Sequence, residues 1–438
     1  MSRVYVYDVQ SHLKTLGYNP GPVDGQFGSK TEKAIVSYFK QKNLNWNGTI
    51  TAFDFFEMRE SISGPKPRMF HGKPGFFEYF AEDNKIKGKQ ASINQKLNNR
   101  KTINVFRPWQ KKELGFEKYS LAWTGWGSEY SEKAVTLRAI KHFAAYLPEN
   151  RKTFKYPGIE KFVTSKNWGS VQEQKYSGVD KVIKLNHPEY PAFIAEIADN
   201  EIKKYYADGV LFDYWHNQHE YGSGYDAATV DKAHLNIVKA VREKIGSNKI
   251  IMGNVNHHKE KATIPYLNGV FLELYKLRKY QNTQELYSKP EYSMIESILE
   301  YYQKNLQYPK LIALEGWRKG RTKAHANSFN LRIAKTLTAM SVVIPENGYI
   351  TFSDNNQKDA DTTHSFYDFY YFDIGKPVEQ GQKLKSGVGI KRHQNGFVAY
   401  NITKKDFSFY VSDKKVVIPK YSGLFCKGIN RFDCLPIN

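Results

Sequence analysis

The sequence predicts a multidomain α/β protein with three parts: a small helical module, a large region of alternating strands and helices, and a small β-rich region. Between about residues 102 and 373, short apolar runs alternate with helical patterns, which is typical of βαβ units. A turn-rich helical segment of about sixty residues comes before this region, and short strands separated by turns come after it.

Composition sets the first limits on function. With 438 residues the chain is long enough for two or three domains with ample core. Its formal net charge of +21 implies attraction to polyanions: a bacterial wall, an acidic glycan, a membrane surface or nucleic acid. No RNA- or DNA-binding motif accompanies the charge, so we expect no specific nucleic-acid partner.

The chain shows no targeting or membrane-spanning segment. No apolar run is long enough for a membrane helix, and the N-terminus lacks the apolar core of a signal peptide. We therefore expect synthesis in a cytoplasm and, for any action outside it, release by a route without a signal peptide. Two cysteines, Cys426 and Cys434, belong to no metal-type cluster. A local disulfide and two free thiols are both consistent with their spacing.

Residues 1–63 predict a compact module of three short helices. Apolar residues fall on one face of each expected helix: Val9, Leu13 and Leu16 in the first, Ala34, Ile35, Tyr38 and Phe39 in the second, Phe53 and Phe56 in the third. The second helix opens near Ser29, after a run of turn-forming residues.

Several residues of this module have a specific spacing. They are Leu16-Gly17-Tyr18, Val23-Asp24-Gly25-Gln26-Phe27-Gly28, Thr31, Ala34, Phe39 and Asn47-Gly48-Thr49-Ile50-Thr51. With them the segment resembles the peptidoglycan-binding domain that is appended to wall hydrolases. One departure is that Lys40 separates Phe39 from Gln41, where the family more often places Gln directly after Phe. The resemblance implies binding to a bacterial wall or another glycan.

Residues 64–101 predict a linker and a docking segment. The run Gly64-Pro65-Lys66-Pro67 is typical of a linker. The aromatic run Phe76-Phe77-Glu78-Tyr79-Phe80 is too apolar to remain in solvent, so we expect it to pack on the next domain.

Residues 102–373 predict a (β/α)8 TIM barrel. Seven apolar runs are assigned to strands: Tyr119–Trp126, Val182–Leu185, Gly209–Phe212, Lys249–Asn254, Gly269–Glu273, Lys310–Glu315 and Tyr349–Phe352. With one early strand not placed, the count is close to eight, and a length of about 270 residues suits this barrel. A doubly wound open sheet is the alternative fold, but the chain has no Gly-rich phosphate loop to favour it.

Three predicted strands end in a carboxylate: Asp213, Glu273 and Glu315. Strand ends of a parallel barrel gather at one mouth, where catalytic side chains lie. Glycoside hydrolysis needs one carboxylic acid to protonate the leaving oxygen, and a carboxylate to attack the anomeric carbon or activate water. A structural ion pair, with Arg318 or Lys276, is the alternative for any single acid. Three buried acids at three strand ends favour catalysis, because unpaired buried carboxylates are costly.

The stretch Lys184–Tyr190, with Ile194, Ile197 and Ile202–Asp213, resembles glycoside hydrolases of the TIM-barrel type. In those families the acid of the fourth strand is commonly catalytic, and an acid of the sixth strand is commonly its partner. The resemblance therefore implies Asp213 as nucleophile or base and Glu273 as general acid. Glu315 is either the true acid or a group that positions substrate.

Aromatic and amide side chains near these acids are the candidates for sugar binding. They are Trp126, Tyr214, Trp215, His216, Asn254, Tyr275 and Trp317, with Trp126 and Trp215 favoured as platforms because they adjoin polar loop residues. His257-His258 carries no metal-ligand pattern, so we expect neither a metal nor another cofactor.

Residues 374–438 predict a small antiparallel β domain with a hairpin turn at Arg392–Gly396. For the whole chain we expect a glycosidase of a bacterial wall or surface polysaccharide, brought to its substrate by the N-terminal module. Such a protein without a signal peptide suits a phage lysin or a virion-borne enzyme. The alternative function is a non-catalytic glycan-binding or virion structural protein on a barrel scaffold.

Overall fold

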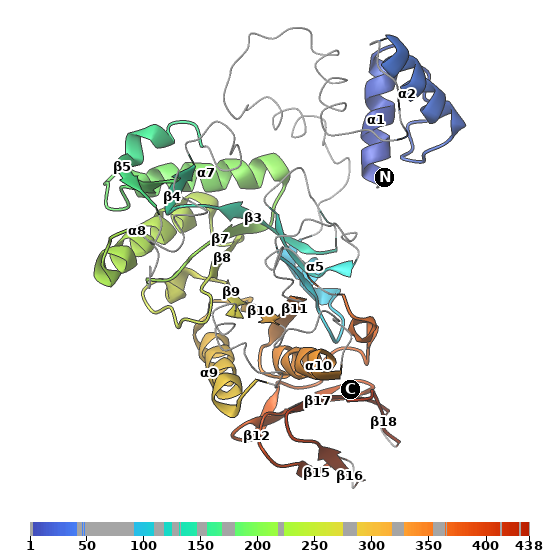
Figure 1. The fold of residues 1–438 in the computed structure, drawn as a ribbon, viewed down its shortest axis with the longest axis vertical. Helices are drawn as coiled ribbons and strands as arrows, with labels where there is room; N and C mark the ends of the chain where they lie inside the picture. Colours follow the sequence, from blue (N-terminus) through green and yellow to red (C-terminus); the bar gives the residue numbers. More distant parts are fainter. Residues whose placement is uncertain are drawn as a thin grey trace. The chain divides into compact units, whose positions relative to one another are not determined.

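The computed structural model describes residues 3–41, 46, 48, 92–108, 118–124, 131, 133–146, 156–168, 180–217, 223–274, 287–317, 328–353, 364, 366–411, 414–428 and 431–437. Two compact units divide the chain, Met1–Tyr79 and Phe80–Asn438. Figure 1 shows helices α1 and α2 in the first unit, and the strands of the barrel with the C-terminal sheets in the second. Among the described helices, none combines the length and apolarity that crossing a bilayer requires.

The N-terminal unit contains two helices, α1 (Arg3–Thr15) and α2 (Ser29–Gln41). Their apolar stripes are buried as predicted, except that Leu16 lies beyond the end of α1 and is half-buried. The expected third helix lies outside the described residues. One buried amide fixes the turn between the helices. Gln10 accepts hydrogen bonds from the backbone of Asp24 and Gly25, and it donates to the carbonyl of Gln26 and the hydroxyl of Thr31. Gly25 has a φ of 75°, a value that glycine adopts without strain.

Eight parallel strands form the centre of the second unit. In barrel order they are β1 (Phe106–Arg107), β2 (Leu121–Thr124), β3 (Val135–Ile140), β7 (Gly209–Phe212), β8 (Ile250–Asn254), β9 (Gly269–Glu273), β10 (Leu311–Trp317) and β11 (Asn347–Ser353). A parallel bridge between Val105 and Ile350 brings the first and last strands together, so the sheet is a nearly closed barrel. The predicted α/β class and barrel are confirmed.

Helices connect successive strands and cover the barrel (Figure 1). They are α7 (Tyr190–Tyr205), α8 (Ala227–Ile245), α9 (Lys289–Asn305) and α10 (Ser328–Val343), with the short α5 (Ile93–Asn98) before β1. Single 3-10 turns lie at η2 (Ile159–Phe162), η3 (Ile264–Tyr266) and η6 (Asp368–Tyr371). One buried cluster fills the barrel interior, and a second lies between the strands and the helices around them.

One predicted barrel strand is wrong. Val182 and Ile183 belong to β6 (Asp180–Ile183), the middle strand of a small antiparallel sheet with β4 (Ala144–Tyr146) and β5 (Val163–Asn167). The third barrel strand is β3, which the prediction left out because Thr136 and Arg138 interrupt its apolar run. Both polar side chains are buried and bonded, Thr136 to Asp208 and Arg138 to Glu201.

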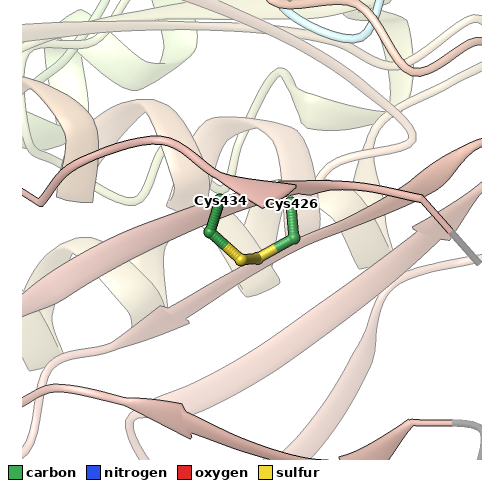
Figure 2. Close-up of a disulfide and its surroundings, with 2 residues drawn as sticks. All are labelled: Cys426 and Cys434. Atoms are coloured by element: carbon green, nitrogen blue, oxygen red, sulfur yellow. A yellow bond between two sulfur atoms is a disulfide. The ribbon is translucent and has the colours of Figure 1, made fainter. Parts of the chain in front are cut away.

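The C-terminal region is antiparallel, as predicted. Five strands, β12 (Gln382–Lys385), β13 (Val388–His393), β14 (Gly396–Asn401), β17 (Ser422–Lys427) and β18 (Asp433–Cys434), form one sheet, and β15 (Phe407–Val411) pairs with β16 (Lys414–Ile418). The predicted hairpin joins β13 to β14, where His393 pairs with Gly396. Figure 2 shows a disulfide between Cys426 and Cys434, which settles the state of the two cysteines in this structure.

Candidate active site

The predicted acids lie at one end of the barrel, where the strands β7, β9 and β10 finish; β8 stands between β7 and β9. Asp213 directly follows β7, Glu273 is the last residue of β9, and Glu315 lies on β10 two residues before that strand ends. Glu273 and Glu315 are paired in register on adjacent parallel strands. Side chains in register on parallel strands leave the sheet on the same face. The three carboxylates therefore belong to one region at the carboxyl ends of the strands.

A single amide joins the first two acids. The Asn254 side chain, at the end of β8, donates from Nδ2 to Asp213 Oδ1 at 3.1 Å and to Glu273 Oε2 at 2.8 Å. Asn254 is itself buried, and its backbone carbonyl accepts a hydrogen bond from the backbone N–H of Trp215 at 2.6 Å. An amide NH₂ group has two N–H bonds at an angle of roughly 120°. With one N–H directed at each acid, Asp213 Oδ1 and Glu273 Oε2 lie about 5 Å apart.

The surroundings of Asp213 shift the pKa of its carboxyl group in opposite directions. Burial raises the pKa of the Asp213 carboxyl above its ordinary value, because a charged carboxylate loses its hydration there. The nearby positive charge of Lys141, the amide of Asn254 and the Tyr214 backbone N–H oppose that rise in pKa. Among the described residues, the two hydrogen-bond donors to this carboxylate both reach Oδ1. Oδ2 accepts no hydrogen bond from the described residues.

The backbone beside Asp213 is unusual. Tyr214 has a φ of 49°, in the left-handed region that residues with a side chain rarely adopt. Strained residues of this kind persist where surrounding contacts hold them, and they gather at active sites. Here the ring of Tyr214 lies 4.9 Å from that of Phe143, between ring centroids. The turn directs the chain away from β7 immediately after the acid.

Glu315 has a partner that the sequence did not indicate. His364 Nε2 lies 2.5 Å from Glu315 Oε1, and both side chains are almost completely buried. The alternative partners Arg318 and Lys276 lie outside the described residues. A buried acid that is held by an imidazole serves to position or tune its neighbours more readily than to move freely onto a substrate.

The other predicted substrate-binding residues fall into three groups. Trp215 and Trp317 are buried, and the rings of Phe212 and His234 stack on Trp215, so both tryptophans contribute to the core beneath the site. Tyr214 is half-buried at the mouth. Trp126 and Tyr275 lie outside the described residues.

The remaining candidate, His216, is buried beside a second strained residue. Its Nε2 lies 3.0 Å from Nδ2 of Asn256, which has a φ of 53°. His216 therefore supports the loops around the site from below. Lys141 was also missed by the sequence analysis, although it directly follows the strand β3. The only signal was its position at the end of an apolar run, and that run was not assigned as a strand.

Together these features define a barrel with a bridged pair of carboxylates at its carboxyl end. Comparison with known families assigns the other unit: residues 2–52 match the family described as "Putative peptidoglycan binding domain". The N-terminal unit is therefore similar to that family, and the predicted resemblance is confirmed. A comparison with curated proteins finds no match.

Solved structures that are similar to the chain at low identity include three glycan-active enzymes. An Anoxybacillus α-amylase is 8% identical with a TM-score of 0.40, over 70% of this chain and 85% of that one. The glycoside hydrolase domain of PelA from Pseudomonas aeruginosa is 7% identical with a TM-score of 0.33, over 50% and 85%. An endo-β-N-acetylglucosaminidase from Cordyceps militaris is 11% identical with a TM-score of 0.30, over 69% and 94%. Barrels host many chemistries, so the activity has to be argued from the site.

Proposed function

We propose that the protein is a glycoside hydrolase that acts on a bacterial cell-wall or surface polysaccharide through Asp213 and Glu273. The observation that carries this proposal is the amide of Asn254, which donates to both carboxylates. Two acids held at a fixed separation at the carboxyl end of a barrel are what the two-carboxylate mechanism requires. The similarity of residues 2–52 to the peptidoglycan-binding family supports a wall glycan as the substrate.

The separation of the acids favours retention of anomeric configuration. Retaining enzymes hold their carboxyl groups about 5–5.5 Å apart, whereas inverting enzymes leave about 6.5–9.5 Å for a water. The Asn254 hydrogen bonds support the first class, because they hold Asp213 Oδ1 and Glu273 Oε2, one oxygen of each acid, about 5 Å apart. In the proposed first step, Asp213 Oδ2 attacks the anomeric carbon while Glu273 protonates the glycosidic oxygen. Glu273, now ionised, then takes a proton from the water that releases the sugar from Asp213.

The other residues have supporting roles in this proposal. Glu315, which is bonded to His364, positions the carboxyl group of Glu273 on the adjacent strand. Tyr214 offers its half-buried ring to the sugar, and Trp126 and Tyr275 remain proposed contacts. The N-terminal unit raises the local concentration of the barrel at the wall.

Digestion of purified peptidoglycan, followed by reducing-end detection and mass spectrometry, tests the proposal. We expect Asp213→Asn and Glu273→Gln each to lower the rate at least about 10²-fold, the usual lower contribution of a catalytic acid or base. Glu196→Gln, a change at an exposed carboxylate on α7, is the matched control and should leave the rate unchanged. An aryl glycoside with a good leaving group should rescue Glu273→Gln alone, because that substrate needs no acid.

The alternative is a glycan-binding protein without catalysis. It predicts that the wild type binds peptidoglycan but releases no reducing ends, and that neither acid variant alters binding. Equal digestion by the wild type and both variants would remove Asp213 and Glu273 from the mechanism.

A further inference from the structure

A second site lies at the opposite end of the barrel from the carboxylates. A cavity of about 170 Å³ is lined by Asn104, which precedes β1, by Gly348, near the start of β11, and by residues of the C-terminal sheet. The beginnings of parallel strands form the face away from the catalytic mouth. The cavity therefore belongs to the junction between the barrel and the C-terminal sheet, and no catalytic residue proposed above takes part in it.

The lining of this cavity is strongly cationic. Its charged and titratable residues are Arg100, Lys101, Glu346, Lys376, Lys391 and His393. Four permanent or near-permanent cations thus face one carboxylate. Lys101 and Lys376 are exposed, which places them at the rim, whereas Lys391 and His393 are buried on β13. Cations gathered in a low-dielectric recess attract anions far more strongly than the same charges on an open surface.

Lys391 is a buried cation whose described hydrogen bonds go to neutral groups. Its Nζ donates to the carbonyls of Val342 at 2.9 Å and Pro345 at 2.7 Å, and the residue is 3% exposed. Burial, together with repulsion from Arg100, lowers the pKa of the Lys391 ammonium to about 8. A buried charge is costly unless it is paired, and a bound anion would provide the missing pair.

His393, also on β13, has a buried ring nitrogen without a hydrogen-bond partner in the described part of the chain. Its Nδ1 lies 2.9 Å from the carbonyl oxygen of Gly375, which fixes the ring at the wall of the cavity. Nε2 is buried and has no hydrogen-bond partner among the described residues, although the side chain is 6% exposed. Buried polar atoms without partners are rare and call for an unseen water, ion or ligand.

We propose that this cavity binds a phosphate-sized oxyanion, held by Arg100, Lys391 and the imidazolium of His393 and reached past Lys101 and Lys376. Because Nδ1 of His393 already donates to Gly375, Nε2 donates to the anion only when the ring is protonated. Burial lowers the pKa of His393, and the charge of a bound anion opposes that shift.

Arg and Lys side chains are the usual partners of such groups. Arg100 donates from Nε to the Leu97 carbonyl and from Nη1 to the Glu346 carbonyl, so Nη2 is the nitrogen that we assign to the anion. The cavity volume of about 170 Å³ equals that of about six water molecules at about 30 Å³ each, which is room for one tetrahedral oxyanion with some of its hydration. Free phosphate and the phosphate of an anionic wall polymer share this chemistry.

Isothermal titration of the full chain with inorganic phosphate, at constant ionic strength in chloride, tests the site. We expect one saturable site in the wild type. His393→Asn keeps a donor near Gly375 and removes Nε2, so binding should weaken about 10-fold, the usual effect of one hydrogen bond to a charged group. Lys376→Gln changes an exposed rim cation and should weaken binding roughly 2- to 5-fold.

Lys415→Gln is the matched control, because Lys415 is an exposed lysine on the β16 strand and does not line the cavity. Its phosphate affinity should equal that of the wild type. The proposal is overturned if the wild type shows no saturable phosphate binding, or if His393→Asn and Lys376→Gln bind as tightly as Lys415→Gln. Lys376→Gln decides the question by itself should His393→Asn fail to fold, since Lys376 is exposed.

Competition separates the two sources of phosphate. Poly(glycerol phosphate) that displaces inorganic phosphate from the wild type, but no longer binds to His393→Asn at the same concentration, would identify a wall polymer as the ligand. Displacement by glycerol 1-phosphate alone would identify a small phosphate ester. Either result upholds the oxyanion site, and neither depends on the activity of Asp213 and Glu273.

Discussion

Replacing Asn254 with Ala tests the centre of the proposed mechanism. The side chain donates to Asp213 at 3.1 Å and to Glu273 at 2.8 Å, so one substitution removes a hydrogen bond from each acid. Glu273 is protonated before the reaction, and ionising it about 5 Å from the Asp213 carboxylate costs about 3 kcal/mol at an effective dielectric constant of about 20. The amide offsets part of that cost and fixes the distance across which the sugar must fit.

The size of the effect follows from what changes during the reaction. Only interactions that strengthen on the way to the transition state affect the chemical step. Glu273 gains negative charge as it gives up its proton, so its hydrogen bond from Asn254 becomes a bond to a charged group, which is worth about 1.5–3 kcal/mol. At about 1.4 kcal/mol for each tenfold change, we expect kcat/KM to fall between about 10-fold and 10²-fold. Because the amide also lowers the pKa of Asp213, the acidic limb of the pH profile should move to higher pH.

The assay is reducing-end release from peptidoglycan across a range of pH, with thermal unfolding to confirm the fold. Asn268→Ala is the matched control, since Asn268 is another buried amide of the barrel that bonds to the Ile251 backbone and the Tyr308 carbonyl. We expect that control to unfold at a lower temperature with an unchanged kcat/KM. A value for Asn254→Ala within threefold of the wild type, with the same pH profile, would refute the bridging role.

Three further predictions concern the surroundings of Asp213 and the disulfide. Lys141→Met removes a charge that lowers the pKa of Asp213, so the acidic limb of kcat/KM should shift to higher pH; an unmoved limb would exclude that coupling. Burial raises the pKa of Asp213 in the folded state above its value in the unfolded chain. The folded state therefore loses stability as pH rises from the ordinary carboxyl pKa through the raised one, and it loses none below the ordinary value. Asp213→Asn should therefore unfold at the same or a higher temperature than the wild type at pH 7, with no such advantage near about pH 3, and a lower melting temperature at pH 7 would contradict this sign. Replacing Cys426 and Cys434 with Ala opens a loop of sequence separation 8 and should cost about 2.5 kcal/mol of unfolding free energy in urea titrations of the oxidised protein, whereas an unchanged midpoint would show that the bond contributes nothing.

The sequence predicted the barrel where apolar runs were continuous, and it missed a strand where they were not. β3 alternates apolar residues that face the barrel interior with Thr136 and Arg138. These polar side chains are buried only because Asp208 and Glu201, distant in sequence, bond to them. Val182 and Ile183 were wrongly assigned to the barrel, since a strand of a small antiparallel sheet has the same local apolar pattern as a barrel strand.

Prediction of the site had a similar limit. Asp213 and Glu273 were proposed as acids because each stands at the end of an apolar strand, and Asn254 was proposed as a sugar contact because it ends another such strand. The tryptophans were assigned to sugar binding on their chain position, but exposure depends on packing from distant elements. Gly253 illustrates the point for Trp215: a Cβ at Gly253 would lie 2.6 Å from the indole, so the ring is packed against the neighbouring strand. No local pattern could have paired Glu315 with His364.

The close packing of the C-terminal sheet against the barrel has a consequence for how this protein can be shortened or recombined. Val398, Tyr400 and Phe425 belong to the same buried cluster as the barrel's outer residues, and a Cβ at Gly423 would lie 2.3 Å from a carbonyl of helix α10. A chain truncated at Asp373 would expose that helix face and should be insoluble. None of the described residues of the N-terminal unit belongs to this cluster. Under the proposed function, binding specificity is therefore best exchanged at the N-terminal unit, with the barrel and the C-terminal sheet transferred as one piece.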